Sequence, residues 1–154
     1  MSKKIGIADT MFARVDMYKT VEKAIMESKE NVKIIRYTVP GVKDLPVACK
    51  RLFTQGCDIC IVLGMPGKEP VDKVCSHEAS QGIGQVQLMV EKHILEVFVY
   101  MDEGKNNSEL LTIAKNRAHD HTLNALALLK GQHTLTPRAG QGVRQGKKDE
   151  GPLE

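Results

Sequence analysis

The side chains best suited to chemistry in this 154-residue chain lie in short segments between apolar runs. They combine an aromatic ring, a guanidinium group, carboxylates and a lysine on a Gly- and Pro-rich loop: Phe12, Arg14, Asp9, Asp16, Asp44 and Lys68. An aromatic ring stacks on a flat heterocycle, loop backbone groups bond its amide edges, and carboxylates accept hydrogen bonds from hydroxyl groups. This mixture indicates a polar heterocycle with a polyol chain. The structural alternative places Phe12 in the core, Arg14 and Asp16 on the surface, and Asp44 at a helix cap.

Other patterns do not favour a metal site or covalent catalysis. Cys57 and Cys60 have the spacing of a ligand pair, but the run 57–63 is typical of a buried strand, in which residues three apart point to opposite faces. We therefore interpret them as buried structural cysteines. His119 and His121 are two apart on a predicted helix and point in different directions, which favours solvated side chains. The sequence has neither a phosphate-binding loop nor a nucleophile elbow.

Composition is that of an ordinary globular domain. The chain is 42% hydrophobic and 27% charged, with a net charge of +3. Basic and acidic residues alternate, so we expect neither nucleic acid nor a membrane as partner. The longest apolar runs, such as 125–129, are far shorter than a membrane span, and the N-terminal run is interrupted at Asp9 before a signal peptide is complete. We expect a cytoplasmic protein.

Short apolar runs alternate with longer runs of helical period. Strands are predicted at 5–8, 32–39, 57–63 and 93–100, and helices at 15–28, 45–53, 71–90 and 109–129. Asp44 is expected to begin the second helix, and Asn107 or Ser108 the fourth. Gly82 and Gly84 lie inside the third helix, where they favour close packing over ligand binding. The order predicts an α/β fold: a doubly wound, mostly parallel four-stranded sheet flanked by helices.

Ligands of such sheets bind beyond the carboxyl ends of the strands. The corresponding loops are 9–14, 39–46, 64–70 and 101–105, and they contain the polar and aromatic side chains described above. From residue 134 the helical pattern ends. We therefore predict a single catalytic domain at 1–133 and a tail or active-site lid at 134–154.

One of these loops carries a motif. The run 39–46, V-P-G-V-K-D-L-P, resembles the V-P-G-x-x-E-x-P signature of lumazine synthases. Together with the runs 12–16, 63–68, 72–80 and 138–146, it makes nearly the whole chain look like the archaeal-type riboflavin synthases, which are relatives of lumazine synthase. The resemblance implies a homopentamer with active sites between subunits. It also implies a reaction: two molecules of 6,7-dimethyl-8-ribityllumazine give riboflavin and 5-amino-6-ribitylamino-uracil by transfer of a four-carbon unit, with Mg2+ supporting activity.

The resemblance also implies roles for individual residues. Phe12, beside Thr10 and Arg14, would stack on the heterocycle, and Phe98 would come from the neighbouring subunit. The ribityl chain would lie on Val42, Lys43 and Asp44, and the pyrimidine ring on Gly64 and Met65. Candidate proton-handling residues are His77 and Glu78, although His77 is equally compatible with a packing role. Arg138 and Arg144 would close over the ligand, or else belong to a disordered end.

One departure separates the two enzymes. Lumazine synthases have a His-rich loop before the third helix, whereas residues 66–72 contain no His here. This favours the dismutation, which uses no phosphorylated substrate. The alternatives are a 6,7-dimethyl-8-ribityllumazine synthase and a non-catalytic flavin- or lumazine-binding module.

Overall fold

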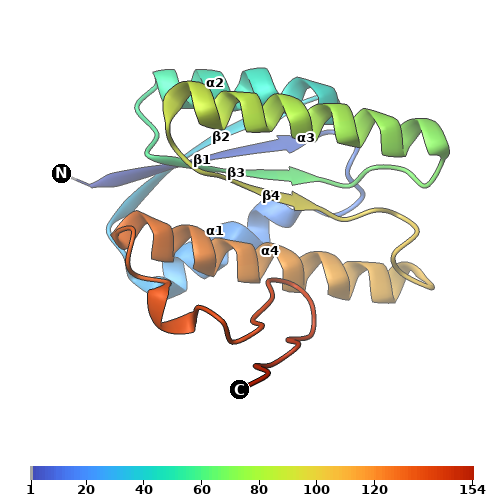
Figure 1. Ribbon diagram of the computed structural model, residues 1–154. Helices are drawn as coiled ribbons and strands as arrows, with labels where there is room; N and C mark the ends of the chain where they lie inside the picture. The colour runs from blue at the N-terminus through green and yellow to red at the C-terminus, as the bar shows by residue number, and fades with distance from the viewer. Residues whose placement is uncertain (1) are drawn as a thin grey trace.

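The computed structural model describes residues 2–154, in which four parallel strands form a sheet between two layers of helices (Figure 1). The elements are β1 (Lys3–Thr10), α1 (Met17–Ser28), β2 (Val32–Val39), the 3-10 helix η1 (Val42–Asp44), α2 (Leu45–Thr54), β3 (Ile59–Gly64), α3 (Pro70–Val90), β4 (Ile94–Phe98), α4 (Asn107–Lys130) and the 3-10 helix η2 (Thr136–Arg138). The strand order is β2-β1-β3-β4. The predicted doubly wound α/β fold is confirmed.

Alternating side chains along the strands form two cores. Ile5, Ile7 and Ile61 pack against α1 and α4, whereas Ala8 and Val62 pack against α2 and α3. Successive strand residues point to opposite faces, so a strand covered on both faces must be apolar throughout. This explains why β3, inside the sheet, is buried at every position. In residues 2–154, no helix is both long and apolar enough to cross a bilayer.

The prediction that Cys57 and Cys60 point to opposite faces is wrong, whereas the prediction that they are buried is confirmed. A Cβ added to Gly6 would lie 2.8 Å from Sγ of Cys60 and 3.1 Å from Sγ of Cys57, so both thiols reach the α2/α3 core. The reason is that β3 begins at Ile59, so Cys57 precedes the strand and its direction does not follow strand alternation. Both are fully buried. Burial raises the pKa of Cys57 to about 11, and a hydrogen bond with Cys49 raises that of Cys60. These thiols are therefore protonated at neutral pH.

Two glycines in α3 differ in their surroundings. A Cβ on Gly82 would lie 2.8 Å from Cγ of Pro46 at the start of α2, whereas one on Gly84 would meet nothing within 4 Å. The absence of a side chain at Gly82 therefore lets α3 approach α2, as the sequence predicted, but Gly84 has no packing role within the chain.

We expect Gly84→Ala to stabilise the protein by about 0.5–1 kcal/mol, because alanine favours the helix and restricts the unfolded chain. Gly82→Ala gains the same helix propensity but forces its methyl group against the rigid Pro46 ring, so its net effect is destabilising by roughly 1 kcal/mol. Urea unfolding followed by circular dichroism compares the pair. Equal midpoints for the two variants would contradict the packing role of Gly82.

The segment after α4 folds back along that helix (Figure 1). Nδ2 of Asn124 donates to Oε1 of Gln145 at 2.6 Å, and the Gly146 amide donates to Oδ2 of Asp120 at 2.8 Å. Between this C-terminal segment and α4 lies a cavity of about 1140 Å³. The segment predicted to be a tail or an active-site lid thus lies against α4, on the face of the sheet opposite α2 and α3.

Candidate active site

The carboxyl end of β3 brings three predicted site residues together. Gly64 pairs with Phe98 across the β3/β4 register. A Cβ added to Gly64 would lie 2.8 Å from Cε1 of Phe98 and 3.1 Å from Cγ1 of Val42. The side chain of Met65, which follows, is fully buried on the other face of the sheet, in the α1/α4 core, whereas Val42 and Phe98 pack against the α2/α3 core. Glycine at position 64 therefore leaves the space in which the Phe98 ring and Val42 lie next to bare backbone.

Two more predicted residues meet beside this point. Nζ of Lys43 in η1 lies 2.7 Å from Oε2 of Glu78 on α3. The hydrogen bond with Lys43 lowers the pKa of Glu78, and the same bond raises the pKa of Lys43. Glu78 is therefore a solvated carboxylate at neutral pH. Its neighbour His77 is exposed, and its ring lies 3.2 Å from the amide of Gln81.

Asp44 is exposed at the start of α2, where it was expected as a cap. Its side chain makes no capping hydrogen bond to the helix. The expected cap of α4 is also displaced: the side chain of Asn106, one residue before Asn107, accepts from the Glu109 amide. Asp44 thus has its carboxylate free of any helix-capping bond, next to the Lys43–Glu78 pair.

The loop after β1 presents an aromatic ring to solvent. Phe12 is 56% exposed, so its placement in the core is wrong. Thr10 is buried, and its Oγ1 accepts a hydrogen bond from the Ala13 amide at 3.3 Å, which shapes the turn. Nη2 of Arg14 donates to Oδ1 of Asn107 at 3.2 Å, which joins this loop to the start of α4. Thr10 and Arg14 line a cavity of about 300 Å³.

The Asp9 carboxylate is hydrogen-bonded to other side chains of the protein. Its carboxylate accepts hydrogen bonds from Nη2 of Arg36 and Oγ1 of Thr38, both at 2.6 Å. Arg36 also pairs with Asp16 and lies over the Tyr18 ring. Asp9 and Asp16 therefore fix the β1 and β2 ends through Arg36. Both oxygens of Asp9 are engaged within the protein, whereas Asp16 contacts Arg36 through Oδ1 alone, at 3.3 Å. Sequence reasoning missed Arg36 because a strand arginine gives no local signal of its partner.

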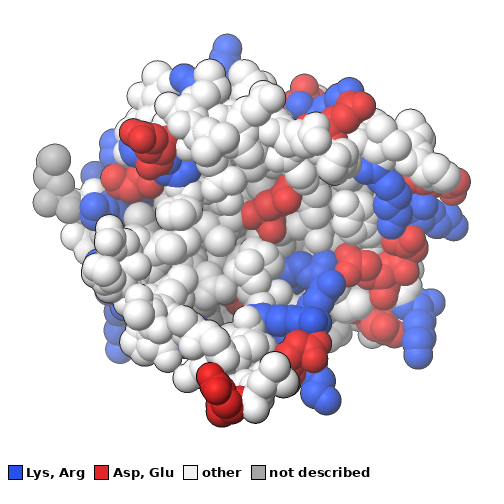
Figure 2. All heavy atoms as spheres, in the orientation of Figure 1, with Lys and Arg blue, Asp and Glu red and all other residues white. Residues whose placement is uncertain are grey.

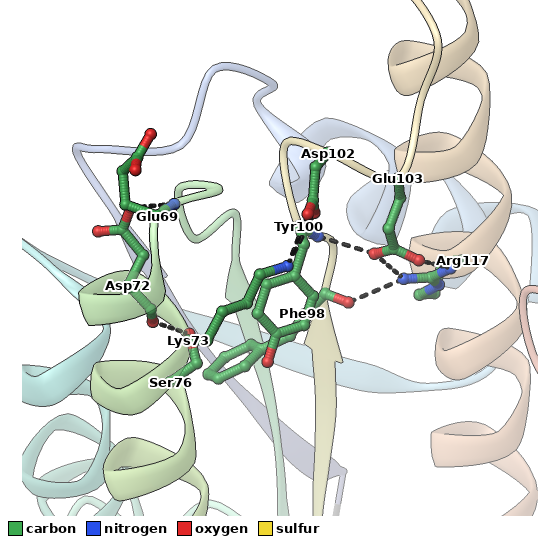
Figure 3. A network of polar contacts seen from close by, with 9 residues as sticks. All are labelled: Glu69, Asp72, Lys73, Ser76, Phe98, Tyr100, Asp102, Glu103 and Arg117. Atoms are coloured by element: carbon green, nitrogen blue, oxygen red, sulfur yellow. Dashed lines mark hydrogen bonds and ion pairs between the residues drawn. The ribbon is translucent and has the colours of Figure 1, made fainter.

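A second network fixes the segment after β4 (Figure 3). Nη1 of Arg117 on α4 donates to the Phe98 carbonyl at 2.9 Å and to Oε2 of Glu103 at 2.8 Å, while Nη2 donates to Oε1 of Glu103 at 2.8 Å. Glu103 also accepts from the Tyr100 amide at 2.7 Å. From the other side, Nζ of Lys73 on α3 bonds Asp102 at 2.8 Å and lies over the Tyr100 ring. Helices from both layers thus hold the segment that carries Phe98.

Sequence reasoning missed Arg117, although a signal was present. Arg117 lies three residues after Ala114 and four before His121, on the stripe of α4 that faces the core. A charged residue on an apolar stripe must be paired when it is buried, which is the property that marks it. His121 on the same stripe is also buried, with Nδ1 2.9 Å from the Arg117 carbonyl, so the prediction that it is solvated is wrong. Burial lowers the pKa of His121.

We expect the contacts of Glu103 to make the stability of the fold decrease at acidic pH. Burial raises the pKa of the Glu103 carboxyl, but hydrogen bonds from Arg117 and the Tyr100 amide together lower it by more, so it lies below its ordinary value. A carboxyl group with a lowered pKa in the folded state contributes fully to the stability of the fold at pH values above its pKa in the unfolded state, about 4.3. This contribution is lost as pH falls through the folded-state pKa.

Glu103→Gln is accordingly expected to cost roughly 2 kcal/mol at pH 7. Its difference from the unmodified protein should begin to shrink below about pH 4, as Glu103 protonates in the unfolded state, and disappear only when pH has fallen through the lower folded-state pKa. Urea unfolding at a series of pH values measures this difference. A difference that stays constant down to pH 3 would show that the Glu103 charge does not matter.

The arginines of the C-terminal segment lie elsewhere. Arg138 and Arg144 line the cavity beside α4, and Nη2 of Arg144 pairs with Glu150 at 2.6 Å. None of the residues lining that cavity comes from the loops that carry Phe12, Val42 and Gly64. Within one chain, therefore, the structure does not bring the two arginines to the strand ends.

The chain matches known proteins over nearly its whole length. The family model described as 6,7-dimethyl-8-ribityllumazine synthase matches residues 2–132. The chain belongs to this family. It is 52% identical over 151 residues to the riboflavin synthase of Methanothermobacter thermautotrophicus, covering 97% of this chain and 99% of that protein. It is 41% identical over 155 residues to the riboflavin synthase of Aeropyrum pernix, covering all of both chains.

A lumazine synthase is a more distant relative. The 6,7-dimethyl-8-ribityllumazine synthase of Bdellovibrio bacteriovorus is 29% identical over 96 residues, which cover 59% of this chain and 53% of that protein. The family resemblance inferred from the sequence is therefore confirmed, and the archaeal riboflavin synthases match over the greater length.

Proposed function

We propose that the chain is an enzyme, a riboflavin synthase, that converts two molecules of 6,7-dimethyl-8-ribityllumazine into riboflavin and 5-amino-6-ribitylamino-uracil. The observation that carries the proposal is the match to riboflavin synthases over essentially their whole length, C-terminal segment included. A lumazine synthase function is less well supported, because that relative aligns with little more than half of the chain.

The geometry at the strand ends suits the positioning of flat rings. The exposed Phe12 ring offers a stacking surface, and the Gly64 backbone beside Phe98 and Val42 offers a narrow apolar wall. Lys43 and Asp44 are exposed next to it and suit the hydroxyls of the ribityl chain. Holding two reactants in a fixed orientation is worth about 7–11 kcal/mol in well-oriented model systems. We infer that positioning is this chain's main contribution to catalysis.

Proton transfer needs only a modest base, because the carbanion formed at the C7 methyl group of the lumazine is delocalised through the ring. His77 and Glu78 are exposed on α3, and Glu78 is ionised and paired with Lys43. A carboxylate with a lowered pKa is a weak base, so we favour a role for Glu78 in fixing Lys43 and assign proton exchange to His77 or to water.

We further propose the homopentamer that the resemblance implies, with Phe98 near the interface. β4 is an edge strand, and no strand within residues 2–154 pairs with its outer side. Val71, Val74 and Leu88 on α3 are more than half exposed. Figure 2 shows broad uncharged surface on one face, interrupted by an acidic group near its middle, with the largest cluster of charged side chains toward the side where the strands end. An uncharged surface of this kind supports packing against another copy.

Mg2+ stays a proposal without a site. Within residues 2–154, no three His, Cys, Asp or Glu side chains lie close enough together to hold a metal ion. The residues of one chain therefore do not fit a dedicated cation site, and no catalytic step is assigned to the metal. Titration of Mg2+ into chelator-treated protein, with turnover as readout, tests whether it supports activity.

The decisive experiment supplies purified protein with 6,7-dimethyl-8-ribityllumazine alone and follows products by absorbance and chromatography. Equal amounts of riboflavin and the pyrimidine support the proposal. Turnover only with 5-amino-6-ribitylamino-uracil and a four-carbon phosphate would identify a lumazine synthase. A shift in ligand fluorescence without turnover under either condition would identify a binding module.

Phe12→Ala is expected to raise KM about 5- to 150-fold, because stacking of one ring on an aromatic side chain is worth about 1–3 kcal/mol. Met11→Ala is the matched control, since Met11 is adjacent and even more exposed, at 74%. Steady-state kinetics on the lumazine compares the two. Equal KM values for Phe12→Ala and Met11→Ala would show that Phe12 does not contact the substrate.

A further inference from the structure

The backbone of the C-terminal segment packs most tightly against α4 at Gly146, where there is no room for a side chain. A Cβ added to Gly146 would lie 2.6 Å from Cγ and 2.7 Å from Cα of Arg117. Gly146 is buried, and its amide donates to Asp120 one helical turn further along α4. The neighbouring Gln145 bonds Asn124. These contacts cover the stem of the Arg117 side chain with backbone from the end of the chain.

The guanidinium group of the same arginine faces the β4 end. Its two terminal nitrogens donate to the Phe98 carbonyl and to both oxygens of Glu103, as Figure 3 shows. Only 8% of the Arg117 surface is exposed. Its Nε atom has no hydrogen-bond partner among residues 2–154. Every hydrogen bond of the guanidinium group in the described chain is therefore made to the segment 98–103.

We propose that Arg117 is a positioning residue for Phe98, and that the C-terminal segment around Gly146 keeps it in place. The inference rests on the proposed function for its kinetic consequence, since it assumes that Phe98 borders the reacting rings. Arg117 does not touch the Gly64 space itself. It acts through the Phe98 carbonyl and through Glu103, which in turn fixes the Tyr100 amide.

The physical basis is exclusion of water. A charged side chain exposed to solvent exchanges its protein partners for water at little cost, whereas a covered one keeps them. Removing the cover over Arg117 therefore weakens its bonds to the Phe98 carbonyl and to Glu103. The Phe98 ring, which lies against Gly64, then loses its fixed position, and a displacement of about 1 Å at a reacting centre reduces rates by up to 100-fold.

The test compares two glycines that both have a positive φ of similar size. Gly146 has φ +72° and Gly140 has φ +78°, so alanine strains the backbone alike at both. Only at Gly146 does the new methyl group meet Arg117, because a Cβ on Gly140 meets nothing within 4 Å. We expect Gly146→Ala to lower kcat for the lumazine roughly 10- to 100-fold while Gly140→Ala stays near the unmodified protein. Equal kcat for the two variants would overturn the proposal.

A second readout does not depend on turnover. Hydrogen exchange at the Tyr100 amide reports its bond to Glu103 directly, and we expect it to accelerate in Gly146→Ala and not in Gly140→Ala. Unchanged exchange in both overturns the positioning role even if the proposed reaction is confirmed. Faster exchange in a protein without turnover on the lumazine would support the coupling and reject only the proposed function.

A second pair of variants, with smaller structural changes, keeps the proposal testable if Gly146→Ala does not fold. Gln145→Ala removes the bond to Asn124, and Gln141→Ala removes a bond within the segment to the Pro137 carbonyl. We expect only Gln145→Ala to lower kcat and accelerate Tyr100 exchange. Arg117→Lys, which retains the charge but loses the two-pronged geometry, is expected to restore part of the kcat lost in Arg117→Met. Equal kcat in these last two variants would show that Arg117 only fills space.

Discussion

Gly64→Ala is expected to lower kcat/KM for the lumazine by about 100-fold or more, with the fold retained. The added methyl group would lie 2.8 Å and 2.9 Å from two atoms of the Phe98 ring and 3.1 Å from Val42. Neither neighbour moves away freely, because Phe98 is tied through its carbonyl to Arg117 and Val42 lies in η1. The Phe98 ring and η1 must both shift, and shifts of this size have such effects on rates.

The control is Gly84→Ala, in which the same methyl group meets no atom within 4 Å. Circular dichroism spectra establish that both variants fold, and steady-state kinetics on the lumazine gives the ratio. An activity of Gly64→Ala within threefold of the control would mean that Phe98 and Val42 do not border the reacting rings.

Ile61→Ala is expected to cost about 2–5 kcal/mol of unfolding free energy. Ile61 is fully buried in the middle of β3, between β1 and β4, and packs into the α1/α4 core. Truncation there leaves a cavity that rigid strands on both sides cannot close. Since a domain is stable by only about 5–15 kcal/mol, this is a large fraction of the total.

Val47→Ala provides the comparison, because Val47 is 55% exposed on α2 and its loss should change stability by no more than about 0.5 kcal/mol. The chain contains no Trp, so urea unfolding is best followed by circular dichroism, at a fixed protein concentration. Similar midpoints for the two variants would contradict the assignment of Ile61 to the central core.

Periodic apolar patterns were sufficient to predict the fold. The third helix was expected at 71–90 and extends over Pro70–Val90, because a long amphipathic stripe begins at a proline and has few competing conformations. The strand 57–63 was placed two residues early, since an apolar run does not reveal where the turn after α2 ends. That small error was enough to misplace the Cys57 side chain.

The candidate site was predictable only in part. Loop residues such as Phe12 and Val42 were predicted as site residues because strand ends of a parallel sheet lie together and because the motif at 39–46 resembled a known one. The pairing of Asp9 with Arg36 and of Glu103 with Arg117 was not predictable, since these partners come from elements far apart in the chain. Local patterns identify a charged residue but not which of several distant charges it will meet.

The strand order also determines when the sheet can be completed during synthesis. β1 lies inside the sheet, paired to β2 on one side and to β3 on the other. As the chain leaves the ribosome, β1 and β2 can pair early, but one edge of β1 stays open until residues 59–64 have emerged. An open, apolar strand edge is prone to pair with other chains. In the interval between synthesis of β2 and of β3, the nascent protein therefore presents an open strand edge through which it can pair with other chains.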